Sequence, residues 1–225
     1  MELKGKTITF LGDSITEGAC LEDVAQDRYD HVLARLAGLK ATRNYGIGGT
    51  RLAHQTVPSS KPRHDLCFCG RAYDLDPEAD ITVVYGGIND YLHGDAPFGS
   101  PEDRTPATFC GGVNFLMDLL QELYPQQQLV FMTPARCCFY GMTDLLPSTF
   151  FEKPVKGERP SLDYVEAIQA AGKARGIPVL DLYHDLGIDP NLPEDRERYT
   201  ADGLHFNDVG HGILARKLKD FLENL

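Results

Sequence analysis

Short apolar runs alternate with helical patterns along this chain. The runs at residues 7–11, 81–85 and 129–133 contain few polar side chains. Such runs are typical of parallel strands that are covered on both faces. We expect two further strands at residues 41–45 and 177–182, so the pattern predicts five strands in all.

Helical periodicity separates these strands. Apolar residues recur three and four positions apart in 29–39 and again in 109–124, where Pro125 ends the pattern. A third helix is expected from Ser161 to Gly176, and a last helix begins at Asn207 or Asp208. The inward positions predicted for these last two helices are Leu162, Val165, Ile168 and Ala171, then Val209, Ile213, Leu214, Leu218, Phe221 and Leu222.

Strands that alternate with helices predict an α/β fold with right-handed crossovers, that is, a five-stranded parallel sheet inside a three-layer α/β/α sandwich. We expect the flavodoxin-like strand order 2-1-3-4-5, which puts the end of the first strand at the switch point where open sheets bind ligands. Residues 1–225 are interpreted as a single domain, because no repeat or linker interrupts them. Irregular stretches at 51–77, 91–106 and 135–160 are expected to wall a pocket at that sheet edge.

Two distant segments carry the residue types needed for acyl transfer to a serine. Ser14 follows the first strand directly, whereas Asp202 and His205 stand three positions apart before the last helix. A serine is a poor nucleophile unless a base lies within hydrogen-bond reach and a third group orients that base. An Asp-x-x-His segment alone is a weak signal, because it also suits a capped turn with a partly buried histidine.

His93 and His211 are rival bases. His93 follows Asn89 closely and is a candidate to line the pocket, and His211 is expected at the surface of the last helix. His205 is favoured because a carboxylate stands at the matching offset.

Two further segments offer hydrogen-bond donors for a developing oxyanion. The sequence NYGIGGT occupies residues 44–50 after the second strand, and GGIND occupies residues 86–90 after the third. Glycines allow a backbone N–H to approach a ligand closely, and Asn89 adds a side-chain amide. Either segment alone is also typical of an ordinary turn.

Taken together, the four segments resemble the SGNH hydrolase family, also called GDSL esterases and lipases. The matching blocks are GDS at 12–14, NYGIGG at 44–49, GIND at 87–90 and DGLH at 202–205, in family order along nearly the whole chain. The resemblance implies the same three-layer fold, with Ser14 as nucleophile, His205 as base and Asp202 as its orienting group. No G-x-S-x-G elbow is present, which argues against the α/β-hydrolase fold.

The resemblance also implies an oxyanion hole made of the Ser14 N–H, a glycine N–H of the second block and the Asn89 side chain. Gly48 and Gly49 both qualify, and Gly49 is preferred from its offset to Asn44. Gly48 is then a candidate substrate contact. Asp13 is a second such candidate, although it and Asp90 are expected mainly to brace their loops.

Arg136, after the fourth strand, is a candidate to hold a carboxylate or a sugar hydroxyl of the substrate, or else a plain surface arginine. Aromatic residues follow it in the same loop and are candidates for sugar stacking, a lid or a contact with another subunit. A contact of this kind would make the protein a homo-oligomer, and the sequence leaves that question open. These residues are Phe139, Tyr140, Phe150 and Phe151.

The charge balance excludes some partners. Twenty-two basic against 33 acidic residues give a net charge of −11, which argues against nucleic acid and against an anionic membrane surface. We see no signal peptide at the N-terminus, and no apolar stretch of the sequence approaches the length needed to span a bilayer, so a cytoplasmic location is expected. The six cysteines are then reduced thiols.

We predict no metal and no cofactor. His64, Cys67 and Cys69 lie close together in sequence, with Cys137 and Cys138 as an imaginable second half, but no C-x2-C pair is present.

The expected function is a serine ester hydrolase that releases short acyl groups from a small-molecule ester, with acetylated carbohydrates as one option. An acyltransferase that uses the same acyl-enzyme is one alternative, and a non-catalytic carbohydrate-binding relative is another. A true lipase is disfavoured because no strongly apolar lid stands out in the sequence.

Overall fold

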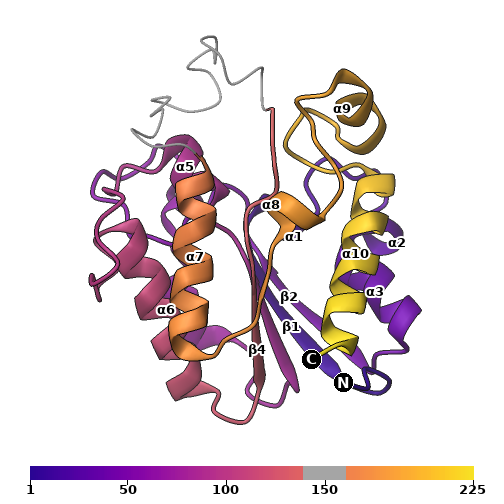
Figure 1. Ribbon diagram of the computed structural model, residues 1–225, viewed down its shortest axis with the longest axis horizontal. Helices are drawn as coiled ribbons and strands as arrows, with labels where there is room; N and C mark the ends of the chain where they lie inside the picture. The colour runs from indigo at the N-terminus through magenta and orange to yellow at the C-terminus, as the bar shows by residue number, and fades with distance from the viewer. Residues whose placement is uncertain (139–160) are drawn as a thin grey trace.

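The computed structural model describes residues 1–138 and 161–225. At its centre lies a five-stranded sheet in the order β2-β1-β3-β4-β5 (Figure 1). All neighbouring strands pair in parallel. The predicted α/β class and strand order are thus confirmed. The strands are β1 (Thr7–Gly12), β2 (Ala41–Gly46), β3 (Ile81–Tyr85), β4 (Gln128–Met132) and β5 (Val179–Leu180).

Helices cover both faces of the sheet and complete the three layers. On one face lie α3 (Tyr29–Ala37) and α10 (Asp208–Glu223), and on the other lie α6 (Phe109–Leu123) and α7 (Ser161–Arg175) (Figure 1). Shorter helices follow the strand ends or lie in the connections between elements. They are α1 (Ser14–Glu17), α2 (Val24–Asp27), α4 (Phe68–Arg71), α5 (Ile88–His93), α8 (Leu182–Asp185) and α9 (Pro193–Tyr199), with 3₁₀ turns η1 (Pro62–Asp65) and η2 (Ala72–Asp74).

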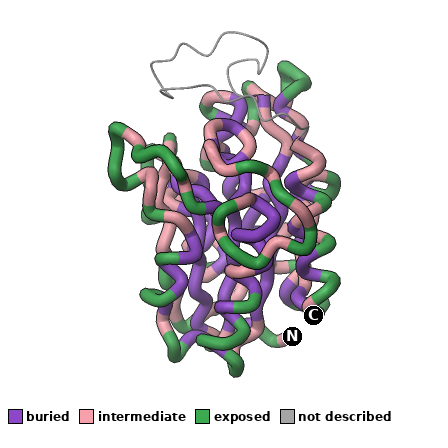
Figure 2. The backbone as a smooth tube through the Cα atoms, turned by 90° about the vertical axis from the view of Figure 1, so that its left-hand side faces the viewer, coloured by how far each residue is buried: buried purple, intermediate pink, exposed green. Residues whose placement is uncertain are grey.

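The sheet divides the apolar interior into two clusters because successive side chains of a strand point to opposite faces. On β1, Ile8 and Phe10 join the cluster beneath α3 and α10, whereas Leu11 joins the cluster beneath α6 and α7. Figure 2 shows buried residues through the interior and exposed residues in the outer turns. Because β1, β2 and β3 are parallel neighbours, the loops that follow them leave the sheet at the same edge.

The fifth strand is shorter than predicted. We expected residues 177–182, but only Val179 and Leu180 pair with β4. Pro178 lacks an N–H for a ladder, and Asp181 ends the strand because its carboxylate accepts a hydrogen bond from the His184 N–H at 3.2 Å and so caps α8. A capping aspartate therefore converts the end of the apolar run into the start of a helix.

The last helix is rotated relative to the prediction. Asn207 caps it by accepting from the Gly210 N–H at 3.0 Å. Val209, expected inside, is 44% exposed, while His211, expected at the surface, is 0% exposed. The His211 ring stacks on Tyr29 of α3, and its Nδ1 accepts the Tyr29 N–H at 3.3 Å. The helix thus turns His211 inward, where it bonds to a neighbouring helix, and leaves Val209 at the surface although its side chain is apolar.

Two smaller differences concern helices. On α7, Tyr164 is buried together with the predicted Val165 and Ile168, whereas Leu162 is only half-buried. The stretch at 51–77, predicted to be irregular, contains α4 and two 3₁₀ turns.

Candidate active site

Ser14 begins α1 immediately after β1. Asp13 caps this short helix, since its Oδ1 accepts a hydrogen bond from the Ile15 N–H at 3.0 Å. A Cβ at Gly12 would lie 2.0 Å from Thr16 Oγ1, so the turn between strand and helix requires glycine there. Asp13 is 1% exposed, and burial raises the pKa of its carboxyl to about 6. Asp13 therefore braces the turn that carries Ser14 from inside, and its side chain has almost no surface exposed to a substrate.

The imidazole of His205 joins the two ends of the chain. Its Nε2 lies 2.9 Å from Ser14 Oγ, across 191 residues of sequence, and its Nδ1 lies 2.7 Å from Asp202 Oδ2. The other carboxylate oxygen of Asp202 accepts the backbone N–H groups of Leu204 and His205 at 2.9 and 2.8 Å. The three side chains therefore form a hydrogen-bonded series from carboxylate to hydroxyl.

The charge state of Asp202 follows from these contacts. Burial alone would raise the pKa of Asp202, but the hydrogen bond and charge of His205 and the two backbone N–H groups outweigh burial and lower it. Asp202 is thus ionised near neutral pH, and a carboxylate accepts the proton on His205 Nδ1. The remaining ring nitrogen, Nε2, is then free of that proton and able to take one from Ser14.

The turn that holds Asp202 and His205 is pinned on both sides. Thr200 and Phe206 form an antiparallel bridge. The Gly203 N–H donates to Thr200 Oγ1 at 3.0 Å, and the Cys138 N–H donates to the Gly203 carbonyl at 2.8 Å. These contacts tie the segment before α10 to the segment after β4, and so present the imidazole at the carboxyl ends of the strands.

The two candidate glycines of the second block have different surroundings. The Gly48 N–H donates to Glu17 Oε2 at 2.7 Å. Among the hydrogen bonds of the described residues, none uses the Gly49 N–H. Gly49 has φ +75°, and a Cβ there would lie 2.7 Å from the His64 ring. The Gly48 N–H is thus engaged by Glu17, whereas the Gly49 N–H has no such partner among the described contacts. Gly49 therefore stays our predicted oxyanion donor.

Asn89 lies in the first turn of α5 and is 3% exposed. Its Nδ2 donates to the Thr50 carbonyl at 3.0 Å, and its Oδ1 lies 3.0 Å from His93 Nε2. An amide nitrogen carries two hydrogens, so a second N–H remains for an oxyanion. Asp90 adds a brace, because its two oxygens accept the Leu52 and Ala53 N–H groups at 2.9 Å each.

Comparison with known proteins identifies the family. The family model described as GDSL-like lipase/acylhydrolase matches residues 10–213. The chain belongs to this family. The predicted resemblance is therefore confirmed at the level of an acylhydrolase family.

Solved structures agree with this assignment in fold. One solved chain is 32% identical, with 100% of this chain and 99% of that chain covered and a TM-score of 0.84. A protein from Lactobacillus plantarum is 29% identical, with 98% of each chain covered and a TM-score of 0.80. The lipase/acylhydrolase from Enterococcus faecalis is 21% identical, with 97% and 96% covered and a TM-score of 0.61. No curated protein matches the chain.

Neither rival base has the surroundings of His205. Burial, helped by the charge of Arg51, lowers the pKa of His93 to about 3, and its two ring nitrogens face Arg51 and Asn89. Burial likewise lowers the pKa of His211 to about 4. Among the described contacts of this acylhydrolase, only the His205 ring lies between a serine hydroxyl and a carboxylate.

Arg136 is turned toward the segment after β5. Its Nε donates to the Tyr183 carbonyl at 3.0 Å, and its Nη1 donates to Asp189 at 3.1 Å. The guanidinium also lies 4.8 Å from the centre of the Tyr183 ring. Arg136 thus links β4 to the 183–189 segment, and its contact with a substrate stays a prediction. The four predicted aromatic contacts, Phe139, Tyr140, Phe150 and Phe151, lie outside the described residues.

Arg71 is a structural member of the site that we did not predict. It is buried, and its Nη2 donates to the Gly12 carbonyl at 3.1 Å and to Thr50 Oγ1 at 2.8 Å. The side chain therefore joins the end of β1 to the loop of the second block. An arginine in the apolar run FCGRA at 68–72 was the available signal, because buried arginines are rare unless they are paired.

Two further findings concern metals and membranes. Within the described ranges, the one group able to converge on a metal ion is Cys20, Asp202 and His205, not the His64–Cys67–Cys69 group considered from sequence. Among the described helices, none is long and apolar enough to cross a bilayer.

Proposed function

We propose that this chain is a serine carboxylic-ester hydrolase that works through an acyl-enzyme on Ser14. The observation that carries the proposal is the hydrogen-bonded series of Asp202, His205 and Ser14, with steps of 2.7 and 2.9 Å. A base within hydrogen-bond reach of a serine, itself oriented by a carboxylate, is the arrangement that activates a serine nucleophile.

The reaction follows from these positions. Ser14 Oγ attacks the ester carbonyl while its proton moves to His205 Nε2. The negative charge on the carbonyl oxygen is met by the N–H groups of Ser14, Gly49 and the Asn89 amide. His205 then gives its proton to the leaving alcohol as the carbon–oxygen bond breaks. A water molecule attacks the acyl group in the same way and releases the acid and free Ser14.

We infer that the substrate carries a short acyl group, and an acetylated carbohydrate is one such ester. The described groups beside the predicted site are polar. Glu17 accepts from the Gly48 N–H and pairs with Arg63 at 2.6 Å, and the His64 ring lies over Gly49. These described groups offer hydrogen-bonding partners for the hydroxyl groups of a small polar ester.

The test compares wild type with Ser14→Ala on a series of nitrophenyl esters from acetyl to octanoyl and on acetylated sugars. We expect hydrolysis to be fastest for acetyl esters and to fall to background in Ser14→Ala, with an unchanged circular dichroism spectrum. Ser100→Ala, outside the site, should keep wild-type turnover. A fluorophosphonate should label Ser14 in the wild type, as located by peptide mass spectrometry.

The same experiment separates the alternatives. Full activity in Ser14→Ala would overturn the nucleophile, and a preference for octanoyl esters would overturn the short-acyl assignment. Acylated sugar formed in place of free acid would indicate an acyltransferase. Binding of acetylated sugars with neither turnover nor labelling would indicate a carbohydrate-binding relative.

A further inference from the structure

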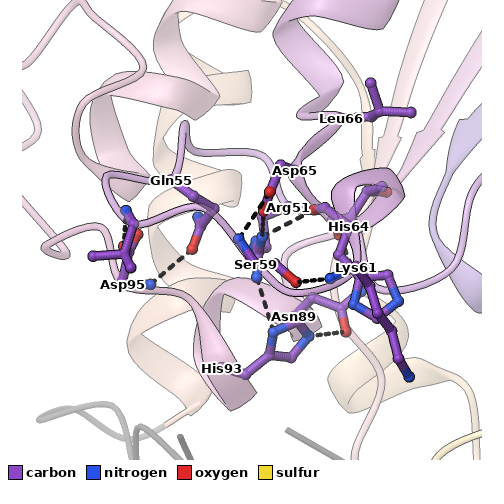
Figure 3. Close-up of polar contacts among 12 residues, drawn as sticks. Arg51, Gln55, Ser59, Lys61, His64, Asp65, Leu66, Asn89, His93 and Asp95 are labelled. Atoms are coloured by element: carbon purple, nitrogen blue, oxygen red, sulfur yellow. Dashed lines mark hydrogen bonds and ion pairs between the residues drawn. The ribbon is translucent and has the colours of Figure 1, made fainter. Parts of the chain in front are cut away.

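A partly buried series of polar contacts leads from Asp65 to the Asn89 amide. Asp65 Oδ1 lies 3.1 Å from Arg51 Nη2, Arg51 Nη1 lies 2.9 Å from His93 Nδ1, and His93 Nε2 lies 3.0 Å from Asn89 Oδ1. Figure 3 shows the His93 ring between the Arg51 guanidinium and the Asn89 side chain. These contacts connect the segment after the second block to α5, and they end at Asn89 of the predicted oxyanion hole.

The guanidinium decides which nitrogen of His93 carries the proton. An arginine can only donate hydrogen bonds, so His93 Nδ1 must accept from Arg51. A neutral imidazole has one acceptor nitrogen and one N–H, so Nε2 carries the hydrogen and donates to Asn89 Oδ1. Burial together with the Arg51 charge lowers the pKa of His93 to about 3, so this ring stays neutral while His205 works.

The proton on His93 in turn decides how the Asn89 amide faces. A primary amide has its acceptor oxygen on one side and its N–H2 group on the other. Because His93 donates, the oxygen must face His93, and the N–H2 group must face the Thr50 carbonyl and the predicted oxyanion position. With the opposite tautomer, a ring lone pair would face the amide oxygen. An amide that turned to relieve this repulsion would lose its bond to the Thr50 carbonyl and direct a carbonyl oxygen at a developing negative charge.

Arg51 itself is held firmly enough to impose this choice. Its side chain is 5% exposed, and its Nη2 also donates to the His64 carbonyl at 2.9 Å. Asp65, its ionic partner, accepts the Ser59 N–H at 2.9 Å through its second oxygen. The guanidinium therefore has fixed partners on the side away from His93, and cannot swing off the ring without losing them.

We propose that Arg51 and His93 are positioning residues of the oxyanion hole: Arg51 holds His93 in the Nε2–H form, and His93 holds the Asn89 amide with its N–H toward the oxyanion. The inference rests on the proposed hydrolase function, in which Asn89 is an oxyanion donor. Neither Arg51 nor His93 contacts the substrate in this scheme, and both act through Asn89.

The kinetic test is a double-mutant cycle on an acetyl ester. His93→Leu should lower kcat by about 10- to 100-fold, less than the 10²–10³-fold expected for loss of the donor in Asn89→Ala, with KM changed by less than about twofold. In the Asn89→Ala background, His93→Leu should add nothing further to the loss of kcat. His93→Gln, which can accept from Arg51 and donate to Asn89, should restore most of the activity.

The outcomes are distinguishable. His184→Leu, an exposed histidine on α8, serves as the matched control and should keep wild-type turnover. Equal losses from His93→Leu in both backgrounds, or no rescue by glutamine in a folded variant, would overturn the inference. If wild type and Ser14→Ala are equally inactive, the proposed function has failed instead.

A second measurement needs no activity. Proton–nitrogen correlation spectra of the histidine side chains should show His93 protonated at Nε2 in wild type, and a shift toward Nδ1 in Arg51→Met. A His93 ring protonated at Nδ1 in the folded wild-type protein would refute the proposal, whatever the enzyme hydrolyses.

Discussion

Asp202→Asn tests whether the carboxylate works by fixing the tautomer of His205. In the structure, one oxygen of Asp202 accepts two backbone N–H groups, from Leu204 and His205, and the other faces His205 Nδ1 at 2.7 Å. An asparagine of the same shape must choose which of these places its N–H2 group occupies.

The backbone N–H groups decide that choice. Turning the N–H2 group toward them would lose two hydrogen bonds and leave two donors facing donors, which costs about 1–3 kcal/mol for each buried group. The N–H2 group therefore faces His205 Nδ1 and moves the ring proton to Nε2, where it blocks proton uptake from Ser14. The active tautomer of His205 would require the unfavourable orientation of the asparagine, at a total cost of about 2–6 kcal/mol. That cost corresponds to a fall in kcat between about 30-fold and 10⁴-fold.

The assay is turnover of an acetyl ester with kcat and KM measured separately. KM should change little, because the carboxylate contacts the ring and the turn. The chain supplies a matched control in Asp181→Asn, since Asp181 holds His184 at 2.7 Å with the same three-residue spacing. Asp181→Asn should keep wild-type kcat. An Asp202→Asn enzyme with kcat within about threefold of wild type would refute the tautomer argument.

Two further predictions concern stability and strain. The pKa of His211 is lowered from 6.5 to about 4 by burial, so its contribution to stability is complete above pH 6.5 and is lost as pH falls to 4. Relative to His211→Gln, wild type should lose about 3 kcal/mol of unfolding free energy over that window, measured by urea denaturation; parallel pH curves would contradict this. Gly49→Ala adds a Cβ 2.7 Å from the His64 ring at φ +75°, whereas Gly5→Ala adds one at φ +77° with nothing within 4 Å. Both should lower the melting temperature, but only Gly49→Ala should lower kcat, by about tenfold or more; equal kcat in the two variants would exclude Gly49 from the oxyanion hole.

Most of the fold was predictable because β1, β3 and β4 are apolar and buried along nearly their whole length. Parallel strands buried on both faces read as short apolar runs, and the alternation with helices leaves few topologies open. The element that departs most from expectation, β5, is ended by Pro178 and by the capping carboxylate of Asp181. Such local hydrogen bonds compete with a ladder in ways that apolar content does not reveal.

The partners of the predicted site residues were less predictable than the residues themselves. Ser14, Asn89 and His205 follow from family blocks, but Arg51 and Arg71 fall in segments that read as irregular loops. Their guanidinium groups reach a hydroxyl, a ring nitrogen and a carbonyl that are 21 to 59 residues away. Sequence spacing does not predict such contacts, because only tertiary packing brings a buried donor to its acceptors.

The two Asp-x-x-His pairs show how little of the proposed chemistry is local. Asp181 and Asp202 each accept the backbone N–H of the histidine three residues on, and each lies 2.7 Å from its ring. Among the described contacts, only His205 meets a serine hydroxyl, at 2.9 Å. The difference lies in docking: α10 packs against α3 beside β1, and the bridge from Thr200 to Phe206 fixes the turn before it. An Asp-x-x-His turn is thus an ordinary local structure, and the packing of the last helix is what makes His205 a candidate catalytic base. Substitutions in the α3–α10 interface should therefore lower turnover before they unfold the protein.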